Sequence, residues 1–152
     1  MTTADPRDIP EEIFDALESL FFGAVGITSF ALADASVADL TLPQWRALVV
    51  IGRADGVRVG EVARRIGLSL PSTSRLIGRL ERRGYVSTER DDRDRRAILV
   101  RLSPSGHAVR QAVIERRREL MHHALSPYAG RLPRDLSKGL ATLGRAFDGY
   151  ER

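Results

Sequence analysis

The stretch that decides the fold is Ser-Leu-Pro-Ser-Thr-Ser-Arg-Leu-Ile-Gly-Arg-Leu-Glu-Arg-Arg-Gly, residues 69–84. Ser69 suits the N-cap of a helix, Pro71 suits its first turn, and Gly84 offers a left-handed stop. At helical spacing one face is apolar and the opposite face is polar and cationic. The first face comprises Thr73, Leu76, Ile77 and Leu80, and the second Ser72, Arg75, Arg79 and Arg82. The sequence therefore predicts a helix that packs on one side and presents positive charge on the other.

A second short helix is predicted directly before this one. Residues 59–68, Val-Gly-Glu-Val-Ala-Arg-Arg-Ile-Gly-Leu, place apolar side chains at helical spacing and end near a glycine. Two short helices joined this closely, the second opening with small polar residues and arginine, are typical of a helix-turn-helix. In that motif the second helix enters the major groove of DNA.

A β-hairpin is predicted after the helix-turn-helix. Residues 85–90 and 97–102 have the composition of strands. They flank Asp91-Asp92-Arg93-Asp94-Arg95-Arg96, which is too polar for anything but an exposed turn. This hairpin would form a wing beside the helix-turn-helix.

The order of these motifs resembles the MarR family of winged helix-turn-helix regulators. Asp94-Arg95-Arg96 followed by Leu102-Ser103-Pro104-Ser105-Gly106 is similar to the family's wing signature, Asp-x-Arg-x5-Leu-Thr-x-x-Gly, with Ser103 in place of threonine. Thr41 to Leu48 also resembles the opening of that family's second helix. The resemblance covers residues 40–107 and implies a mainly α fold with a small β-wing, comprising a winged helix-turn-helix DNA-binding lobe and a helical dimerisation region.

Helical patterns flank the predicted lobe on both sides. We expect residues 1–40 to hold an N-terminal dimerisation helix that opens at Pro10, residues 41–103 the DNA-binding lobe, and residues 104–152 C-terminal dimerisation helices. Amphipathic helices at the two ends cannot all bury their apolar stripes against one small lobe, so we expect a homodimer. The resemblance implies the same arrangement, with the end helices interleaved between two subunits.

Charge is distributed unevenly along the 152 residues. Segments 1–57, 58–103 and 104–152 carry net charges of −6, +6 and +4. Positive charge in the helix-turn-helix and wing is the footprint of a polyanion-binding protein. The absence of cysteine excludes disulfides and thiolate metal sites. We see neither an uninterrupted apolar run that would span a membrane nor a basic leader, and so expect a cytoplasmic protein.

The expected DNA-binding residues lie on the second helix and on the wing. Ser69, Ser72 and Ser74 are short enough to let the helix approach phosphates and base edges. Arg75 and Arg79 can reach guanine or phosphate, and Arg75 is the best candidate for reading a base. The wing arginines, which can enter a narrowed minor groove, are Arg93, Arg95 and Arg96.

The wing signature also includes an acidic residue. We expect Asp94 to steady one of the wing arginines, and by the resemblance Arg96 has a partly structural role. Two recognition helices related by a two-fold axis would require a pseudo-palindromic site with half-sites about one helical turn apart.

The resemblance places an effector pocket between the helical base and the winged lobe. Trp45 is the expected wall of this pocket, with Phe21 and Arg46 beside it, although aromatic side chains in such positions more often belong to a core. The expected effector is a small aromatic or anionic molecule that releases DNA.

Catalytic, metal and cofactor sites are not predicted. His107, His122 and His123 lack a second group of ligands. The acidic pairs Glu11-Glu12 and Asp91-Asp92 suit a helix start and a solvated wing tip, so they do not indicate acid–base chemistry.

The function that accounts for all these features is a sequence-specific, double-stranded-DNA-binding transcriptional regulator, a ligand-responsive repressor that acts as a homodimer. A sequence-independent DNA-organising protein is the alternative, but it would not need a two-sided recognition helix with small polar residues. A winged helix that binds only proteins would not need a cationic wing.

Overall fold

The computed structural model describes residues 9–34, 39–91, 94 and 96–150. The chain runs through α1 (Glu11–Ala33), α2 (Leu42–Ile51), β1 (Val57–Arg58), α3 (Val59–Ile66), α4 (Leu70–Arg82), β2 (Val86–Arg90), β3 (Ile98–Leu102), α5 (Pro104–Leu125), the short 3-10 turn η2 (Ser126–Tyr128) and α6 (Leu136–Tyr150). The expected fold class, mainly α with a small β-wing, is confirmed.

The winged lobe consists of α2, α3, α4 and a three-stranded antiparallel sheet of order β1-β3-β2. Val100 of β3 lies at the centre of the sheet, paired with Val57 on one side and Thr88 on the other. The sequence predicted only the two strands of the hairpin. A strand of two residues such as β1 is too short to show the alternation by which strands are recognised.

One apolar core holds the lobe together and continues onto α5. Its fully buried side chains come from every layer: Leu48, Ile51, Val62, Thr73, Leu80, Val100 and Val113. Leu48 and Ile51 belong to α2, and Leu80 belongs to α4. Because α4 contributes its apolar face to this core, its opposite face is fixed toward solvent.

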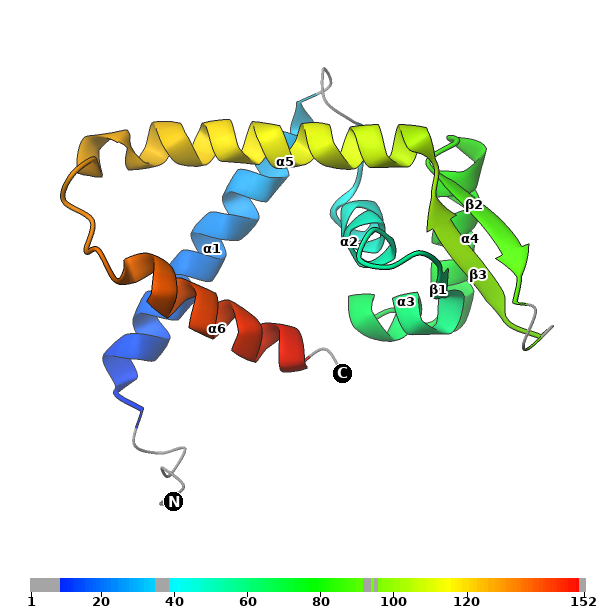
Figure 1. Cartoon of the computed structure of the whole chain (residues 1–152), viewed down its shortest axis with the longest axis horizontal. Helices are drawn as coiled ribbons and strands as arrows, with labels where there is room; N and C mark the ends of the chain where they lie inside the picture. Colours follow the sequence, from blue (N-terminus) through cyan, green and yellow to red (C-terminus); the bar gives the residue numbers. More distant parts are fainter. Residues whose placement is uncertain (1–8, 35–38, 92–93, 95, 151–152) are drawn as a thin grey trace.

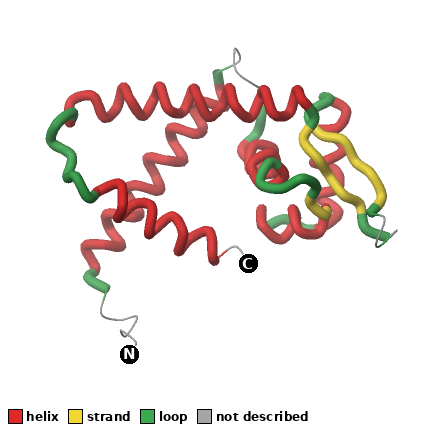
Figure 2. Tube along the Cα trace, in the orientation of Figure 1, coloured by secondary structure: helices red, strands yellow, loops and turns green. Residues whose placement is uncertain are grey.

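Helix α5 joins the lobe to the rest of the molecule. Figure 1 shows α5 running along one edge of the molecule, with α1 passing beneath it and α6 folding back across α1. Figure 2 shows all the strands gathered at the lobe end and only helices and loops at the other end. Phe21 of α1 meets Phe147 of α6 edge-on, with their ring centroids 5.1 Å apart.

The start of α5 is fixed to the turn that follows α4. Ser103 caps α5 by accepting a hydrogen bond from the Gly106 amide at 3.0 Å. Its own amide donates to the Tyr85 carbonyl at 3.0 Å, and its hydroxyl donates to the Gly84 carbonyl. A Cβ on Gly106 would lie 1.9 Å from the Tyr85 carbonyl oxygen. The Leu-Ser-x-x-Gly part of the wing signature is therefore structural.

Helix α1 leaves much of its apolar surface uncovered. Phe22 is 85% exposed and Phe30 is 73% exposed. Further exposed apolar side chains on α1 are Ile13, Phe14, Leu20, Phe21 and Val25. Helix α6 likewise exposes Leu136, Leu140 and Phe147. Together these side chains form a large apolar surface at the end of the molecule away from the wing, which we call the α1/α6 surface.

Helix α1 also has the length and composition of a membrane span. It has 23 residues, and its best 18-residue window has a mean hydropathy of 1.6. The sequence predicted no membrane span, because acidic residues such as Glu18 interrupt the apolar run. Length and composition do not distinguish a membrane span from an apolar helix that packs on protein.

Candidate nucleic-acid interface

Helix α4 has the limits that the sequence predicted. The Ser69 hydroxyl accepts a hydrogen bond from the Ser72 amide at 3.4 Å and donates to the Ser72 hydroxyl at 3.0 Å. At the other end Gly84 adopts φ +73°, the left-handed conformation that ends a helix at little cost only for glycine. Ser69 and Ser72 therefore define the start of the helix, besides lying on its accessible side.

The two faces of α4 are separated as expected. Thr73, Leu76, Ile77 and Leu80 are buried. The exposed face carries a shallow hollow of about 450 Å³, lined by Ser74, Arg75, Gly78, Arg79 and Arg82. We call it the α4 hollow. Its three guanidinium groups make it a surface suited to the polyanionic backbone of DNA.

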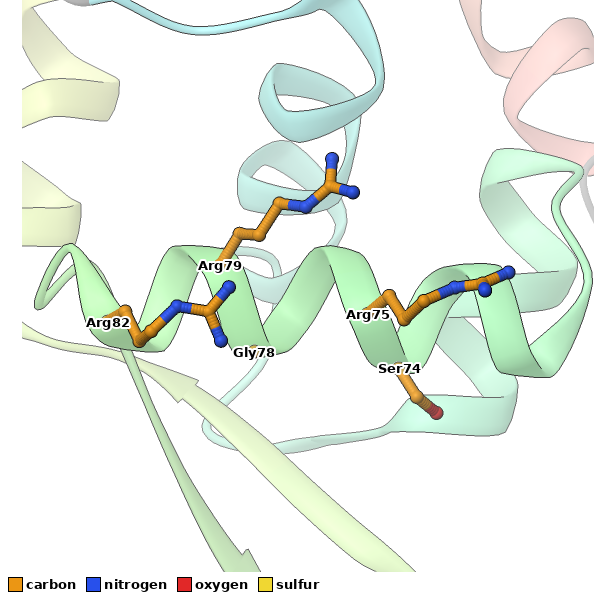
Figure 3. Close-up of a pocket in the computed structure, with 5 residues that line it drawn as sticks. All are labelled: Ser74, Arg75, Gly78, Arg79 and Arg82. Carbon is orange, nitrogen blue, oxygen red and sulfur yellow. The ribbon is translucent and has the colours of Figure 1, made fainter.

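The arginines of the α4 hollow reach in different directions (Figure 3). Arg75 extends along the helix toward its N-terminal end, and Arg79 rises away from the helix on one side. Both also line a neighbouring hollow of about 340 Å³, together with Ser72 and the first turn of α2. Arg82 lies over Gly78. Arg75 is thus directed toward the half of the helix that reads bases in a helix-turn-helix.

The base of the wing lies beside the start of α4. Arg96 and Ser74 line the same hollow of about 340 Å³. The Asp94 carboxylate accepts a hydrogen bond from the Arg96 backbone amide at 3.1 Å. Asp94 thus steadies Arg96 as expected, and does so through the main chain. Arg93 and Arg95 lie outside the described residues.

The environment of Asp91 differs from the one that the sequence predicted. Asp91 was assigned to a solvated wing tip, but it is only 6% exposed. Its carboxylate accepts hydrogen bonds from Nε and Nη2 of Arg58, at 2.9 and 2.6 Å. Arg58 is the N-cap residue of α3, so this ion pair ties the wing to the helix-turn-helix. The two residues are 33 positions apart, and no local pattern indicates that they meet.

A second ion-pair network on the outer side of the sheet was also missed. Arg101 of β3 contacts Asp55 at 2.6 Å and Glu89 of β2 at 2.9 Å. The hydrogen bond to Glu89, supported by the negative charge of Asp55, raises the pKa of Arg101 above its usual value. This arginine is neutralised within the fold, so it stabilises the sheet and adds little to the field that DNA meets.

The expected effector residues are only partly brought together. Trp45 is 4% exposed, and it lines a pocket of about 150 Å³ with Arg46, Val49, Val50, Arg53 and Arg117. Arg46 also donates hydrogen bonds to the carbonyls of Arg65 and Ile66 at the end of α3. Phe21 is not among the lining residues, because it contacts Phe147 edge-on in the helical region.

Within residues 9–34, 39–91, 94 and 96–150, three or more His, Cys, Asp or Glu side chains do not come together in a way that could hold a metal ion.

Sequence comparison bears on the same segment. Residues 38–97 match the family model described as MarR family. The winged lobe belongs to the MarR family. The matched segment contains α2, α3, α4, β2 and the wing turn, which are the elements that build the cationic face described above.

Individual relatives agree with this assignment. The uncharacterised HTH-type regulator YfiV of Bacillus subtilis is 26% identical over 129 residues, which cover 83% of this chain and 81% of YfiV. The transcriptional activatory protein BadR of Rhodopseudomonas palustris is 42% identical over 73 residues, 46% of this chain and 42% of BadR. The crystal structure of RV1404 from Mycobacterium tuberculosis has the same fold, with a TM-score of 0.79, 23% identity, and coverage of 96% of this chain and 97% of RV1404. The winged lobe thus matches the MarR family, and along most of its length the chain is similar to an HTH-type transcriptional regulator.

Proposed function

We propose that this MarR-family regulator binds double-stranded DNA sequence-specifically, as a homodimer on a pseudo-palindromic operator. The observation that carries the proposal is the α4 hollow, where three arginines are presented on the face opposite the core. The residues proposed to contact DNA are Ser69, Ser72, Ser74, Arg75 and Arg79 on α4, and Arg93, Arg95 and Arg96 on the wing. Residues 41–103 form the DNA-binding unit in this proposal.

Genome-wide selection of DNA fragments by the purified protein tests sequence specificity. We expect the retained fragments to share an inverted repeat whose half-sites are about one helical turn apart. Retention of fragments without a shared motif would favour the alternative of a DNA-organising protein. In that case the protein should bind unrelated competitor DNA as tightly as it binds the retained fragments.

The homodimer is proposed from the α1/α6 surface, with residues 1–40 and 104–152 as the dimerisation regions. Exposed apolar patches of this kind mark interaction surfaces in soluble proteins. Phe22→Glu should place a charge on this surface and produce monomers in light scattering, whereas Ser87→Glu on the exposed side of β2 should leave the dimer intact. A monomeric wild-type protein would contradict the proposal.

The cytoplasmic location remains part of this proposal, and α1 makes it testable. A dimerisation helix keeps the protein in the soluble fraction of a cell extract, whereas a membrane-spanning α1 would carry it into the membrane fraction. Recovery in membranes that resist a salt wash would refute the proposed role of α1.

Repression is the proposed sign of regulation, because a dimer covering an operator blocks polymerase wherever the two sites overlap. Activation is the second candidate, favoured by the similarity to BadR, whose name describes an activatory protein. A reporter gene behind the selected operator, measured with and without the regulator, distinguishes the two by the direction of the change.

An effector is proposed at the Trp45 pocket. Arg46, Arg53 and Arg117 surround an apolar wall there, a composition suited to a small aromatic anion. Trp45 is the only tryptophan of the chain, so its fluorescence reports on the pocket directly. Titration with aromatic acids should change Trp45 emission and weaken operator binding together. If neither changes while the protein binds DNA, we would treat it as a constitutive regulator.

A further inference from the structure

We infer that the sugar–phosphate backbone of DNA lies directly against α4 at Gly78, and that Arg82 holds the backbone there. The inference rests on DNA binding through α4 and specifies which part of DNA meets which part of the helix. It concerns two residues that the sequence analysis did not include among the DNA-binding positions.

Gly78 lies in the interior of α4, where glycine is unfavourable. A glycine inside a helix costs roughly 1 kcal/mol of stability relative to alanine. Gly78 is helical and its φ is not positive, so its backbone conformation does not require glycine. The atoms around Gly78 therefore decide whether the absence of a side chain at this position has a role.

The described part of the molecule offers no internal reason of that kind. A Cβ built on Gly78 would find only Nη1 of Arg82 within 4 Å, at 3.9 Å, which is ordinary contact with the end of a flexible side chain. Gly106 is a useful contrast, because a Cβ there would collide with a backbone carbonyl at 1.9 Å. A Cβ would also meet nothing within 4 Å at the other helical glycines Gly23, Gly26, Gly60, Gly139 and Gly144. Gly78 is distinguished from them by its place among three arginines.

The position of Gly78 on the surface indicates an external reason. It forms the floor of the α4 hollow, between Arg75, Arg79 and Arg82 (Figure 3). Ser74, Gly78 and Arg82 are four residues apart, so they follow one another along a single face of the helix. A side chain at position 78 would fill the centre of a cationic surface and keep a partner away from the helix backbone.

Helix geometry identifies that partner as the strand at the edge of the major groove. Gly78 lies about 12 Å along the axis from Leu70, at 1.5 Å per residue. The major groove is about 12 Å wide, and a recognition helix reads bases with its N-terminal half. When Ser72 and Arg75 face the bases, Gly78 and Arg82 therefore meet the bounding sugar–phosphate strand.

The test compares Gly78→Ala with Gly144→Ala, using DNA fragments selected by the wild-type protein. Gly144 lies in α6, and a Cβ there would also meet nothing within 4 Å, so it serves as the matched control. We expect Gly78→Ala to raise the melting temperature by about 2–4 °C, because alanine favours the helix. We also expect it to weaken binding by about tenfold or more, on scrambled and operator DNA alike, because a backbone contact is not sequence-specific. Because Gly144 lies in the proposed dimerisation region, light scattering must first show the wild-type oligomeric state for Gly144→Ala, which should then retain wild-type affinity.

Arg82→Ala tests the second half of the inference, with Arg131→Ala as its control. Arg131 is exposed in the loop between η2 and α6, away from the lobe (Figure 1). Loss of one phosphate contact should reduce the slope of log affinity against log salt by about one unit for Arg82→Ala and leave it unchanged for Arg131→Ala.

The possible outcomes separate this inference from the proposed function. Wild-type affinity in Gly78→Ala, or an unchanged salt slope in Arg82→Ala, overturns the inference. A lower melting temperature in Gly78→Ala also overturns it, because the glycine would then have an internal role. If the wild-type protein selects no DNA, the proposed function itself fails.

Discussion

Replacement of Gly106 by alanine should destabilise the winged lobe, although alanine normally favours a helix. The new methyl carbon would lie 1.9 Å from the Tyr85 carbonyl oxygen, whereas ordinary contact begins at 3.4 Å. The carbonyl must therefore move by about 1.5 Å, because a close-packed interior has no free space to absorb the methyl group. That movement breaks the 3.0 Å hydrogen bond from the Ser103 amide.

Three contributions determine how much Gly106→Ala changes the free energy of unfolding. Overpacking costs about 1–3 kcal/mol, the broken hydrogen bond costs about 0.5–1.5 kcal/mol, and alanine returns up to about 1 kcal/mol of helix propensity. We expect a net loss of about 0.5–4.5 kcal/mol in the free energy of unfolding, or about 1–18 °C in melting temperature for a chain of this size.

The assay is thermal and urea unfolding followed by circular dichroism. Gly60→Ala is the matched control, because it lies in the same lobe and a Cβ there would meet nothing within 4 Å. The reasoning would be refuted if Gly106→Ala were as stable as Gly60→Ala, since the contact with Tyr85 would then carry no cost.

Three further changes test other parts of the lobe. Arg75→Ala should lose about 1–3 kcal/mol of binding to operator DNA while the protein stays folded; in gel shifts, equal weakening on scrambled DNA would mean that Arg75 holds only phosphate. Asp91→Asn should lower the melting temperature and weaken DNA binding, because the buried partner of Arg58 loses its charge; unchanged values of both would show that the ion pair does not position the wing. Hydrogen bonding from Arg64 lowers the pKa of Glu61 below its usual value of 4.5. The unfolded chain therefore binds a proton at Glu61 more readily than the folded chain does. As the pH falls below about 4.5, the wild-type protein should lose stability relative to Glu61→Gln. Equal acid sensitivity in melting experiments would contradict this.

Local signals made much of the lobe predictable from the sequence. Ser69 and Gly84 mark the ends of α4, and its buried and exposed faces follow directly from helical spacing. The start of α5 at Pro104 agrees with the expected start of the C-terminal helices at residue 104, because Ser103 suits an N-cap and Pro104 suits a first turn.

The parts that could not be predicted depend on residues far apart in the chain. Arg58 meets Asp91, and Arg101 meets Asp55, only because the sheet arranges its three strands in the order β1-β3-β2. The sequence of a polar turn does not show which of its carboxylates is solvated and which is buried. Phe21 was grouped with Trp45 because both are aromatic, whereas the fold places it against Phe147.

Helix α5 has a mechanical consequence for the whole molecule. Its 22 residues make a rod of about 33 Å, and Ser103 and Gly106 clamp one end of that rod to the turn after the recognition helix. A tilt of about 5° at the far end therefore displaces the lobe by about 3 Å, an estimate that treats the helix as a rigid lever. In a two-fold assembly two such levers would move in opposite directions, so a small rearrangement among the apolar helices would change the distance between recognition helices by a significant part of a groove width.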